Sequence, residues 1–276
     1  MSLDFLQKII DVLRLHLSKE ILWEHYKKYK EIEKYKDNTE TLILGSSHGV
    51  YGYNAIDGEY NLALSSQDLY YSFKLYEKYS AELPKLKNII LFYSVFSNGF
   101  ILDKTGEKQR VLAYKNLFKI PVLNDSLYFK VYNLSFPHYL GKVKKRLINY
   151  NHGNIENPKF FVDPEITPEL RAKQHLKNNL RPNKQNYWVE NLINLAKNNK
   201  HCVYIVLSPA TDAYKNCLPD SKELFKDILD LICDKDVCLV DLYNSELFTD
   251  EDFGDLDHLN SNGAEKLSNY VRNLIR

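Results

Sequence analysis

The sequence of 276 residues has few glycines and prolines, 10 and 9, and it contains no internal repeat or low-complexity segment. It also lacks a hydrophobic run near the length of about 18 residues that a membrane-spanning helix needs. The N-terminus has no basic start followed by an apolar core and a small-residue cleavage site. We therefore expect a cytoplasmic protein without membrane insertion, long enough to bury a sizeable core.

Charge of one sign is not in excess, because 37 Lys and Arg side chains stand against 36 Asp and Glu side chains. A chain balanced in this way has no global field that would draw it to nucleic acid or to an anionic membrane. We therefore expect no nucleic-acid partner and recognition of a small molecule through local contacts. The composition leaves the oligomeric state open.

Cysteines are few, and none is part of a CxxC motif. Two of them lie inside apolar runs that resemble strands. These features predict buried free thiols in a reducing compartment, although an even count leaves disulfides possible. The four residues are Cys202, Cys217, Cys233 and Cys238.

Glycine-rich phosphate loops of either nucleotide-binding kind are also missing, which argues against an ATP or dinucleotide enzyme. Asp255, Asp257 and His258 could be imagined as metal ligands. However, no second histidine or further carboxylate cluster has ligand spacing. We therefore expect neither a metal nor a cofactor.

Hydrophobic periodicity alternates between strands and helices. Short apolar runs predict strands, and apolar residues at three- and four-residue steps predict helices between them. This alternation implies right-handed crossovers and a mostly parallel, five-stranded sheet between helix layers, an α/β/α sandwich. The expected strands are residues 41–44, 59–64, 88–95, 202–207 and 237–242, and the expected helices lie at residues 67–83, around 188–195, at 224–232 and at 264–274.

Two parts of the chain fall outside this alternation. Residues 1–38 have the spacing of an amphipathic helix, and we expect it to pack on the α/β domain of residues 39–276 rather than on a membrane or a partner. Residues 98–167 mix short apolar pieces with Asn, Pro and Gly, and we interpret them as an irregular helical insertion. Its basic run is better explained by a solvated helix face than by contact with an anionic substrate; the run is Lys142, Lys144, Lys145 and Arg146.

Polar residues follow the predicted strands at their carboxyl ends, which meet at one edge of a parallel sheet. Ser47 lies in a small-residue turn after the first strand, and Asp255 and His258 lie on the loop before the last helix. A serine hydroxyl needs an adjacent base, and a carboxylate on the other ring nitrogen holds the histidine in the required tautomer. We therefore predict that Ser47 is a nucleophile, His258 its base and Asp255 the orienting acid. An acidic surface loop is the alternative for either aspartate taken alone.

Two segments resemble signature blocks of the SGNH (GDSL-like) hydrolase and acyltransferase superfamily. Leu44-Gly45-Ser46-Ser47-His48 is similar to the first block, with Ser46 in place of its aspartate, and Asp255-Leu256-Asp257-His258 resembles the last. The resemblance covers roughly residues 40–276. It implies a flavodoxin-like fold and a serine-dependent esterase or acyltransferase, with small acyl groups on carbohydrates as a common substrate class.

The middle blocks depart from the family pattern and resemble those of divergent, polysaccharide-modifying members, which have serine-rich turns in place of the glycine and asparagine. Residues 61–67 lack the glycine, and residues 93–99 lack the Gly-x-Asn-Asp, that supply oxyanion donors in the family. The resemblance then implies the backbone N–H of Ser47 and that of Ser65 or Ser66 as donors, provided that the turn needs no positive φ. Asn98, Ser94 or neither would be the third donor.

Further residues near these blocks have weaker assignments. His48 is expected to line the substrate pocket or to serve the turn structurally, and Ser94 to contact substrate. His138 and His175 belong to no motif, so surface or core positions are expected for them. Two other functions stay open: a carbohydrate-binding protein without activity on a degenerate SGNH fold, and a scaffold acting through the N-terminal helix.

Overall fold

The computed structural model describes residues 19–123, 133, 136–137, 140–155, 165–179 and 184–275. The chain divides into two compact units, Met1–Lys34 with Ile101–Tyr150 and Tyr35–Phe100 with Asn151–Arg276. Residues 1–18 of the expected N-terminal helix, His138 and parts of the expected insertion lie outside the described residues. Among the helices that are described, none combines the length and the apolar character needed to span a bilayer.

Among the described residues, the first unit contains residues 19–34 of the expected N-terminal helix and part of the expected insertion. Its aromatic side chains meet edge to face: the ring of His25 lies 5.0 Å from that of Tyr114, and Tyr29 lies 5.7 Å from Phe118. That the N-terminal helix packs on the α/β domain stays a prediction. The described elements are α2 (Lys19–Tyr35), η1 (Leu102–Lys104), η2 (Lys108–Arg110), α5 (Val111–Ala113) and η3 (Tyr114–Phe118).

The basic run belongs to this unit, and its four side chains are exposed. Such exposure agrees with the solvated helix face that the sequence predicts. They are Lys142, Lys144, Lys145 and Arg146.

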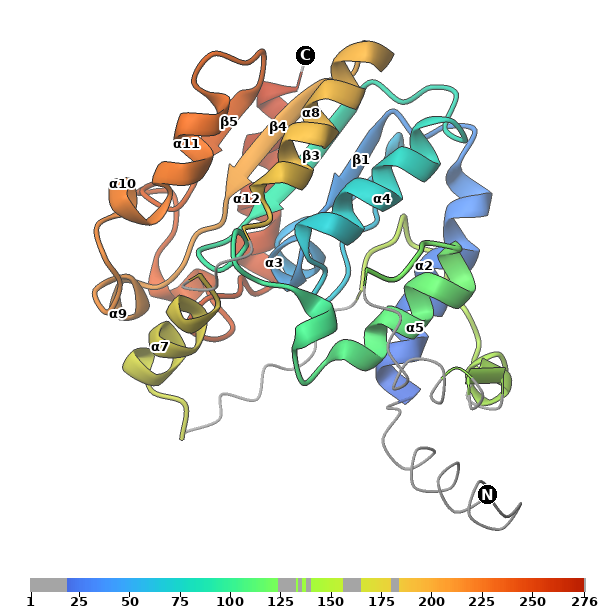
Figure 1. Cartoon of the computed structure of the whole chain (residues 1–276), viewed down its shortest axis with the longest axis horizontal. Coiled ribbons are helices and arrows are strands. Elements are labelled where there is room, and N and C mark those ends of the chain that lie inside the picture. Colours follow the sequence, from blue (N-terminus) through green and yellow to red (C-terminus); the bar gives the residue numbers. More distant parts are fainter. Residues whose placement is uncertain are drawn as a thin grey trace. The chain divides into compact units, whose positions relative to one another are not determined.

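The second unit is built on a five-stranded sheet in the order β2-β1-β3-β4-β5 (Figure 1). Every strand pair is parallel, so the predicted α/β class is confirmed. This is the flavodoxin-like order, in which the strand sequence reverses between β1 and β3. The strands are β1 (Thr41–Leu44), β2 (Glu59–Asn61), β3 (Asn88–Tyr93), β4 (Cys202–Leu207) and β5 (Cys238–Asp241).

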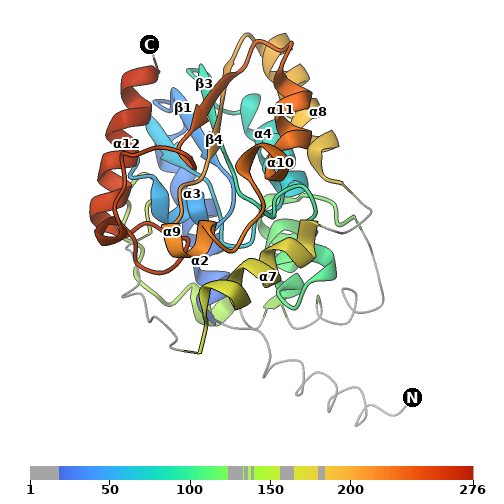
Figure 2. The ribbon, with the colours of Figure 1, turned by 90° about the vertical axis from the view of Figure 1, so that its left-hand side faces the viewer.

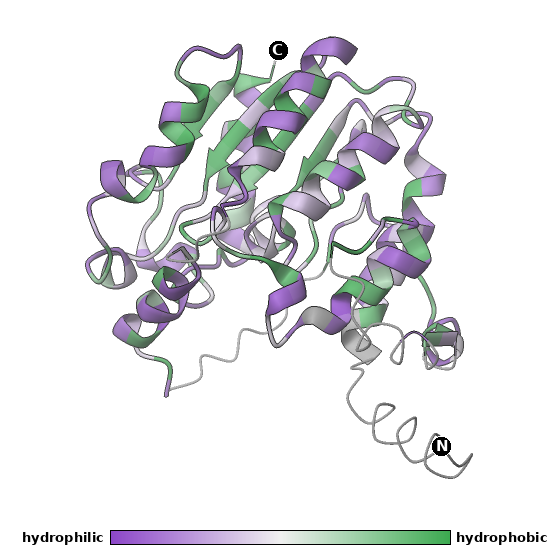
Figure 3. Ribbon diagram, viewed as in Figure 1, coloured by the Kyte–Doolittle hydropathy of each residue, from purple (hydrophilic) through white to green (hydrophobic). Residues whose placement is uncertain are grey.

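Helices cover both faces of the sheet, because its strands are apolar on both sides. On one face, Ile43, Phe92 and Val206 pack against Leu267 and Val271 of the last helix. On the other face, the Tyr93 hydroxyl donates to Asn186 at 2.8 Å. Figure 2 shows the two layers, and Figure 3 shows apolar strands between helices of mixed polarity. The first layer holds α3 (Ser47–Gly52) and α12 (Ser261–Leu274); the second holds α4 (Leu69–Ser80), α8 (Asn186–Asn199) and α11 (Lys226–Ile232).

Several short helices at the carboxyl edge were not predicted, because they are too short or too polar to show a periodicity. β2 and β3 also end earlier than expected, since the chain bends there into loops. The additional helices are α3, α7 (Pro168–Asn179), α9 (Asp212–Lys215) and η4 (Asp250–Asp252), and α10 (Ser221–Leu224) precedes α11 as a separate turn.

All four cysteines are free, but the prediction that they are buried is wrong. Cys202 and Cys238 are the first residues of β4 and β5, and both are exposed. In β4 only this first residue is exposed, whereas in β5 only Val240 is buried, so an apolar run in the sequence does not guarantee the burial of each of its residues.

Candidate active site

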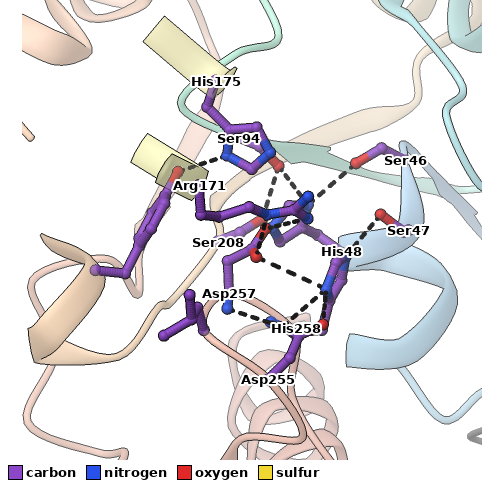
Figure 4. Close-up of polar contacts among 12 residues, drawn as sticks. Ser46, Ser47, His48, Ser94, Arg171, His175, Ser208, Asp255, Asp257 and His258 are labelled. Carbon is purple, nitrogen blue, oxygen red and sulfur yellow. Dashed lines mark hydrogen bonds and ion pairs between the residues drawn. The ribbon is translucent and has the colours of Figure 1, made fainter. Parts of the chain in front are cut away.

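The site lies where the strand order reverses, a position at which the loops after neighbouring strands leave in opposite directions and form a crevice. Ser47 follows β1, and Ser94 follows β3. Ser208 follows β4, and His258 lies on the loop between β5 and α12. Figure 4 shows these side chains converging from separate elements. The predicted clustering of polar groups at the carboxyl edge is therefore what the structure contains.

The turn after β1 places the Ser47 hydroxyl at the start of α3. Gly45 has a φ of +130°, which turns the chain sharply out of the strand. Ser46 is the extended N-cap residue, and Ser47 is the first residue of the helix. The first N–H groups of a helix have no acceptor within it. The N–H of Ser47 therefore points out of the helix beside its own hydroxyl.

Ser47, His258 and Asp255 form a continuous hydrogen-bonded row. His258 Nε2 lies 2.8 Å from Ser47 Oγ. His258 Nδ1 lies 2.8 Å from Asp255 Oδ2 and 3.0 Å from Oδ1. Asp255 Oδ1 also accepts the backbone N–H groups of Asp257 and His258, at 2.9 and 2.8 Å, which fixes the carboxylate. The structure thus brings together the three residues singled out from the sequence.

The electrostatics of this row suit a proton acceptor. Burial disfavours the charged form of His258, but the charges of Asp257 and Asp255 outweigh burial and raise the pKa of the ring. Burial likewise opposes ionisation of Asp255, yet its bond to His258 lowers the pKa of the carboxyl. An ionised Asp255 accepts from Nδ1–H, which leaves the Nε2 lone pair facing the Ser47 hydroxyl.

A second row of similar composition runs alongside the first. His48 Nε2 lies 3.2 Å from Asp257 Oδ2, and His48 Nδ1 lies 2.8 Å from Ser94 Oγ and 3.2 Å from Ser46 Oγ. The His48 ring stacks on that of His258 with centroids 4.8 Å apart. Burial lowers the pKa of His48 and outweighs the bond to Asp257. His48 is therefore a neutral ring and a weaker base than His258.

Arg171 of α7 forms an ion pair with Asp257 at the end of the second row. Its Nε donates to Asp257 Oδ1 at 2.8 Å and its Nη2 donates to Oδ2 at 3.2 Å. Burial alone would raise the pKa of Asp257, but His258, His48 and Arg171 hold it well below the usual range. Asp257 is thus engaged by the second row, and it is the more buried of the two aspartates.

A metal ion suits these residues poorly. His48, Asp257 and His258 offer ligand atoms within 4.8 Å of one another. However, the Arg171 guanidinium pairs with both carboxylate oxygens of Asp257. The nitrogens of His258 bond Ser47 and Asp255. A cation would have to displace a bound guanidinium and break the Ser47 row, so the donor set favours the hydrogen-bonded arrangement.

The loop after β2 lies beside the Ser47 turn, because the Leu64 N–H donates to the Gly45 carbonyl at 3.1 Å. Ser65 and Ser66 follow and are half-buried. Ser66 has a φ of +58°, so the turn does require the left-handed conformation. The condition under which serine replaces glycine without cost therefore fails at Ser66, where a non-glycine residue is strained.

Asn98 is placed differently from the expectation. Its Nδ2 donates to Asp227 at 2.8 Å, and its Oδ1 accepts the Asn186 N–H at 3.2 Å. These contacts tie the loop after β3 to α8 and α11, so the expected role of Asn98 as an oxyanion donor is corrected to a structural one. Ser94 is the residue of this loop that reaches His48.

Arg171 and His175 are the residues that the sequence did not reveal as members of this group. They lie four residues apart on α7 and thus on one helix face. His175 Nδ1 lies 2.5 Å from the Tyr214 hydroxyl, and its ring packs 4.6 Å from that of Phe96. The core position considered for His175 is confirmed, since it is 7 % exposed. The four-residue spacing was the available signal, and it carried no motif.

His175 is expected to make the fold sensitive to acid. Burial lowers its pKa to about 3. The unfolded chain binds a proton near pH 6.5 and the folded chain does not, so stability falls as the pH drops between these values. Between pH 7.5 and 5, His175 should cost about 2 kcal/mol of the free energy of unfolding. Urea unfolding of wild type and His175→Gln at both pH values measures this. An equal loss of stability in both proteins would contradict it.

No model of a protein family matches the sequence, and no curated protein matches it. Solved structures do align with most of the chain. One is a "putative acylhydrolase" from Bacteroides fragilis, with 11% identity, a TM-score of 0.40 and coverage of 87% of this chain and 88% of that chain. Another is a GDSL-like lipase from Bacteroides thetaiotaomicron, with 10% identity, a TM-score of 0.42 and coverage of 91% and 98%. The third is a "putative lipolytic protein" of the G-D-S-L family from Desulfitobacterium hafniense, with 11% identity, a TM-score of 0.38 and coverage of 86% and 99%.

Proposed function

We propose that the protein is a serine-dependent ester hydrolase or acyl transferase of the SGNH type, in which Ser47, His258 and Asp255 form a catalytic triad. The observation that carries the proposal is that His258 bridges Ser47 and Asp255, with both contacts at 2.8 Å. Two residues separated by 211 positions in the chain meet there in the order that nucleophilic catalysis requires.

The reaction would begin with attack of Ser47 Oγ on the acyl carbonyl carbon while His258 Nε2 takes up the hydroxyl proton. The carbonyl π electrons move to oxygen, and Asp255 stabilises the imidazolium that forms. Collapse of the tetrahedral intermediate expels the alcohol, which receives the proton from His258. Water or a second hydroxyl then attacks the acyl-enzyme with His258 again as base. Water completes a hydrolysis, which we favour, and a sugar hydroxyl completes a transfer.

The oxyanion would be held mainly by backbone N–H groups. The donors would be the N–H of Ser47 at the start of α3 and those of Ser65 and Ser66, on the loop whose Leu64 N–H bonds the Gly45 carbonyl. The side-chain amide that the family places after β3 has no counterpart at Asn98. One missing donor lowers the rate about 100- to 1000-fold, so a slow enzyme is expected unless a substrate group or Ser94 supplies the third bond.

A small acyl group, such as acetyl on a carbohydrate, is the substrate class that we propose from the resemblance to polysaccharide-modifying branches. The second candidate function is a carbohydrate-binding protein without activity. It is favoured by one observation, the engagement of the Asn98 amide with Asp227 and Asn186. The hydrogen-bonded row of Ser47, His258 and Asp255 favours the enzyme over the binding protein, because a binding protein does not need a nucleophile aligned with its base.

Covalent labelling tests the proposal. A fluorophosphonate should form one adduct per chain, and peptide mass spectrometry should place it on Ser47 rather than on Ser46, because only Ser47 lies next to His258 Nε2. The unlabelled protein should hydrolyse 4-nitrophenyl acetate slowly, and this activity should be lost once labelling is complete. Absence of an adduct at millimolar fluorophosphonate would favour the binding protein.

A further inference from the structure

We propose that Arg171 and Asp257 act as a pair of positioning residues that set how readily His258 takes up the serine proton. Neither residue belongs to the proposed triad, and neither is placed to touch the reacting atoms. The inference deepens the proposed function and rests on it. It assigns a task to the second row of the site, which the reaction itself does not use.

Asp257 is placed to act on His258 by charge rather than by a hydrogen bond. Its Oδ1 lies 3.9 Å from His258 Nδ1, beyond bonding distance, while Asp255 holds that nitrogen. The Asp257 side chain is only 2 % exposed, so water screens its field weakly. Arg171 binds the same carboxylate, and its positive charge opposes the effect of Asp257 on His258.

His48 contacts both Asp257 and His258 without adding charge. Its Nε2 is taken by Asp257, and its Nδ1 faces the Ser94 and Ser46 hydroxyls. Stacked on His258 at 4.8 Å, a charged His48 would repel the imidazolium formed during attack. Burial keeps His48 neutral, so the electrostatic field at His258 comes from the carboxylates of Asp255 and Asp257 and the guanidinium of Arg171.

Among the described residues, the charged and titratable groups that contact His258 or act on its charge come from three elements. The balance is one guanidinium against two carboxylates, and burial lowers the pKa of His48 and of His175, so both rings are neutral at pH 7. The groups are Asp255 and Asp257 on its own loop, His48 and Tyr51 on α3, and Arg171 and His175 on α7.

Opposite charges predict opposite shifts. Arg171→Gln leaves Asp257 uncompensated, which favours the imidazolium and raises the pKa of His258. Asp257→Asn removes the negative charge and leaves Arg171 nearby, so the pKa falls. Nucleophilic attack needs neutral His258, and the acid limb of the pH profile follows its pKa. The midpoint of this acid limb should shift by about one pH unit, to higher pH in Arg171→Gln and to lower pH in Asp257→Asn.

Two measurements test the pair. The first is the rate of fluorophosphonate inactivation against pH, which reports the free enzyme. The second is the titration of His258 by NMR with histidine labelled at Cε1, assigned with His258→Gln. The NMR titration needs no turnover, so it tests the pair even if Ser47 proves unreactive. Lack of labelling would then overturn the proposed function alone, and unshifted or equally directed titrations would overturn the pair alone.

Matched variants separate charge from structure. The double variant Arg171→Gln with Asp257→Asn keeps a hydrogen-bonded neutral pair, and its limb should return toward wild type. It also supplies a folded protein if Asp257→Asn alone leaves Arg171 unpaired and unfolds the chain. Arg272→Gln breaks the comparable pair with Glu59, whose Nε–Oε1 distance is 3.0 Å, away from the site. It should lower stability without moving the limb. A limb that moves in Arg272→Gln as in Arg171→Gln would overturn the proposal.

Discussion

Ser47→Ala is expected to lower kcat/KM for 4-nitrophenyl acetate by about 10⁴- to 10⁶-fold. The variant should keep the fold, because Ser47 is only half-buried and alanine leaves out a single oxygen atom, whose contact is with His258 Nε2. It removes the atom that would form the acyl-enzyme, so only transition-state binding by backbone N–H groups would remain. Initial rates with matched protein concentrations, corrected for spontaneous hydrolysis, measure the loss.

Ser46→Ala is the control for this experiment. Ser46 is the neighbouring serine, and it is bonded to His48 Nδ1 at 3.2 Å instead of to His258. Its loss should change the rate by less than about tenfold, since Ser94 still donates to His48. His258→Gln should match Ser47→Ala, and the double variant should be no slower than either, because the two residues act as one unit. Activity in Ser47→Ala above a tenth of wild type would exclude Ser47 as the nucleophile.

The sheet architecture and the row formed by Ser47, His258 and Asp255 could both be predicted from the sequence, for related reasons. Buried parallel strands appear as short apolar runs with polar residues at their carboxyl ends, and topology then brings those ends to one edge. Ser47 could be placed at that edge because Gly45 and the apolar strand precede it. His258 and Asp255 are three residues apart, so local geometry was enough to pair them. No long-range packing had to be known.

The second row could not be predicted, because its contacts, apart from that between Ser46 and His48, join segments distant in the chain. Arg171 and Asp257 are separated by 86 residues, and His48 and Ser94 by 46. The helix that carries Arg171 follows an aperiodic segment, and its polar composition gave no apolar face to detect. The backbone conformation of Ser66 could not be predicted for a different reason. The sequence shows that a glycine is missing, but it does not show the sign of φ at that residue.

Gly45→Ala is expected to destabilise the second unit by about 2–5 kcal/mol, the sum of backbone strain and steric overlap. Gly45 has a φ of +130°, a region that residues with a side chain rarely adopt. A Cβ there would lie 2.8 Å from the Phe92 Cβ and 2.9 Å from the Phe92 carbonyl oxygen. Phe92 belongs to β3, the neighbouring strand, so neither atom can move without disturbing the sheet.

Gly58→Ala separates the two contributions to this loss. Gly58 has a φ of +84°, but a Cβ there would meet no atom within 4 Å. It should therefore carry only the backbone strain, about 1–2 kcal/mol, and leave ester hydrolysis unchanged. Gly45→Ala should also slow fluorophosphonate labelling, since a displacement of about 1 Å at Ser47 costs about 100-fold in rate. Chemical denaturation gives the first comparison and labelling kinetics the second. Equal stability losses in both variants would mean that Phe92 does not constrain the turn carrying Ser47.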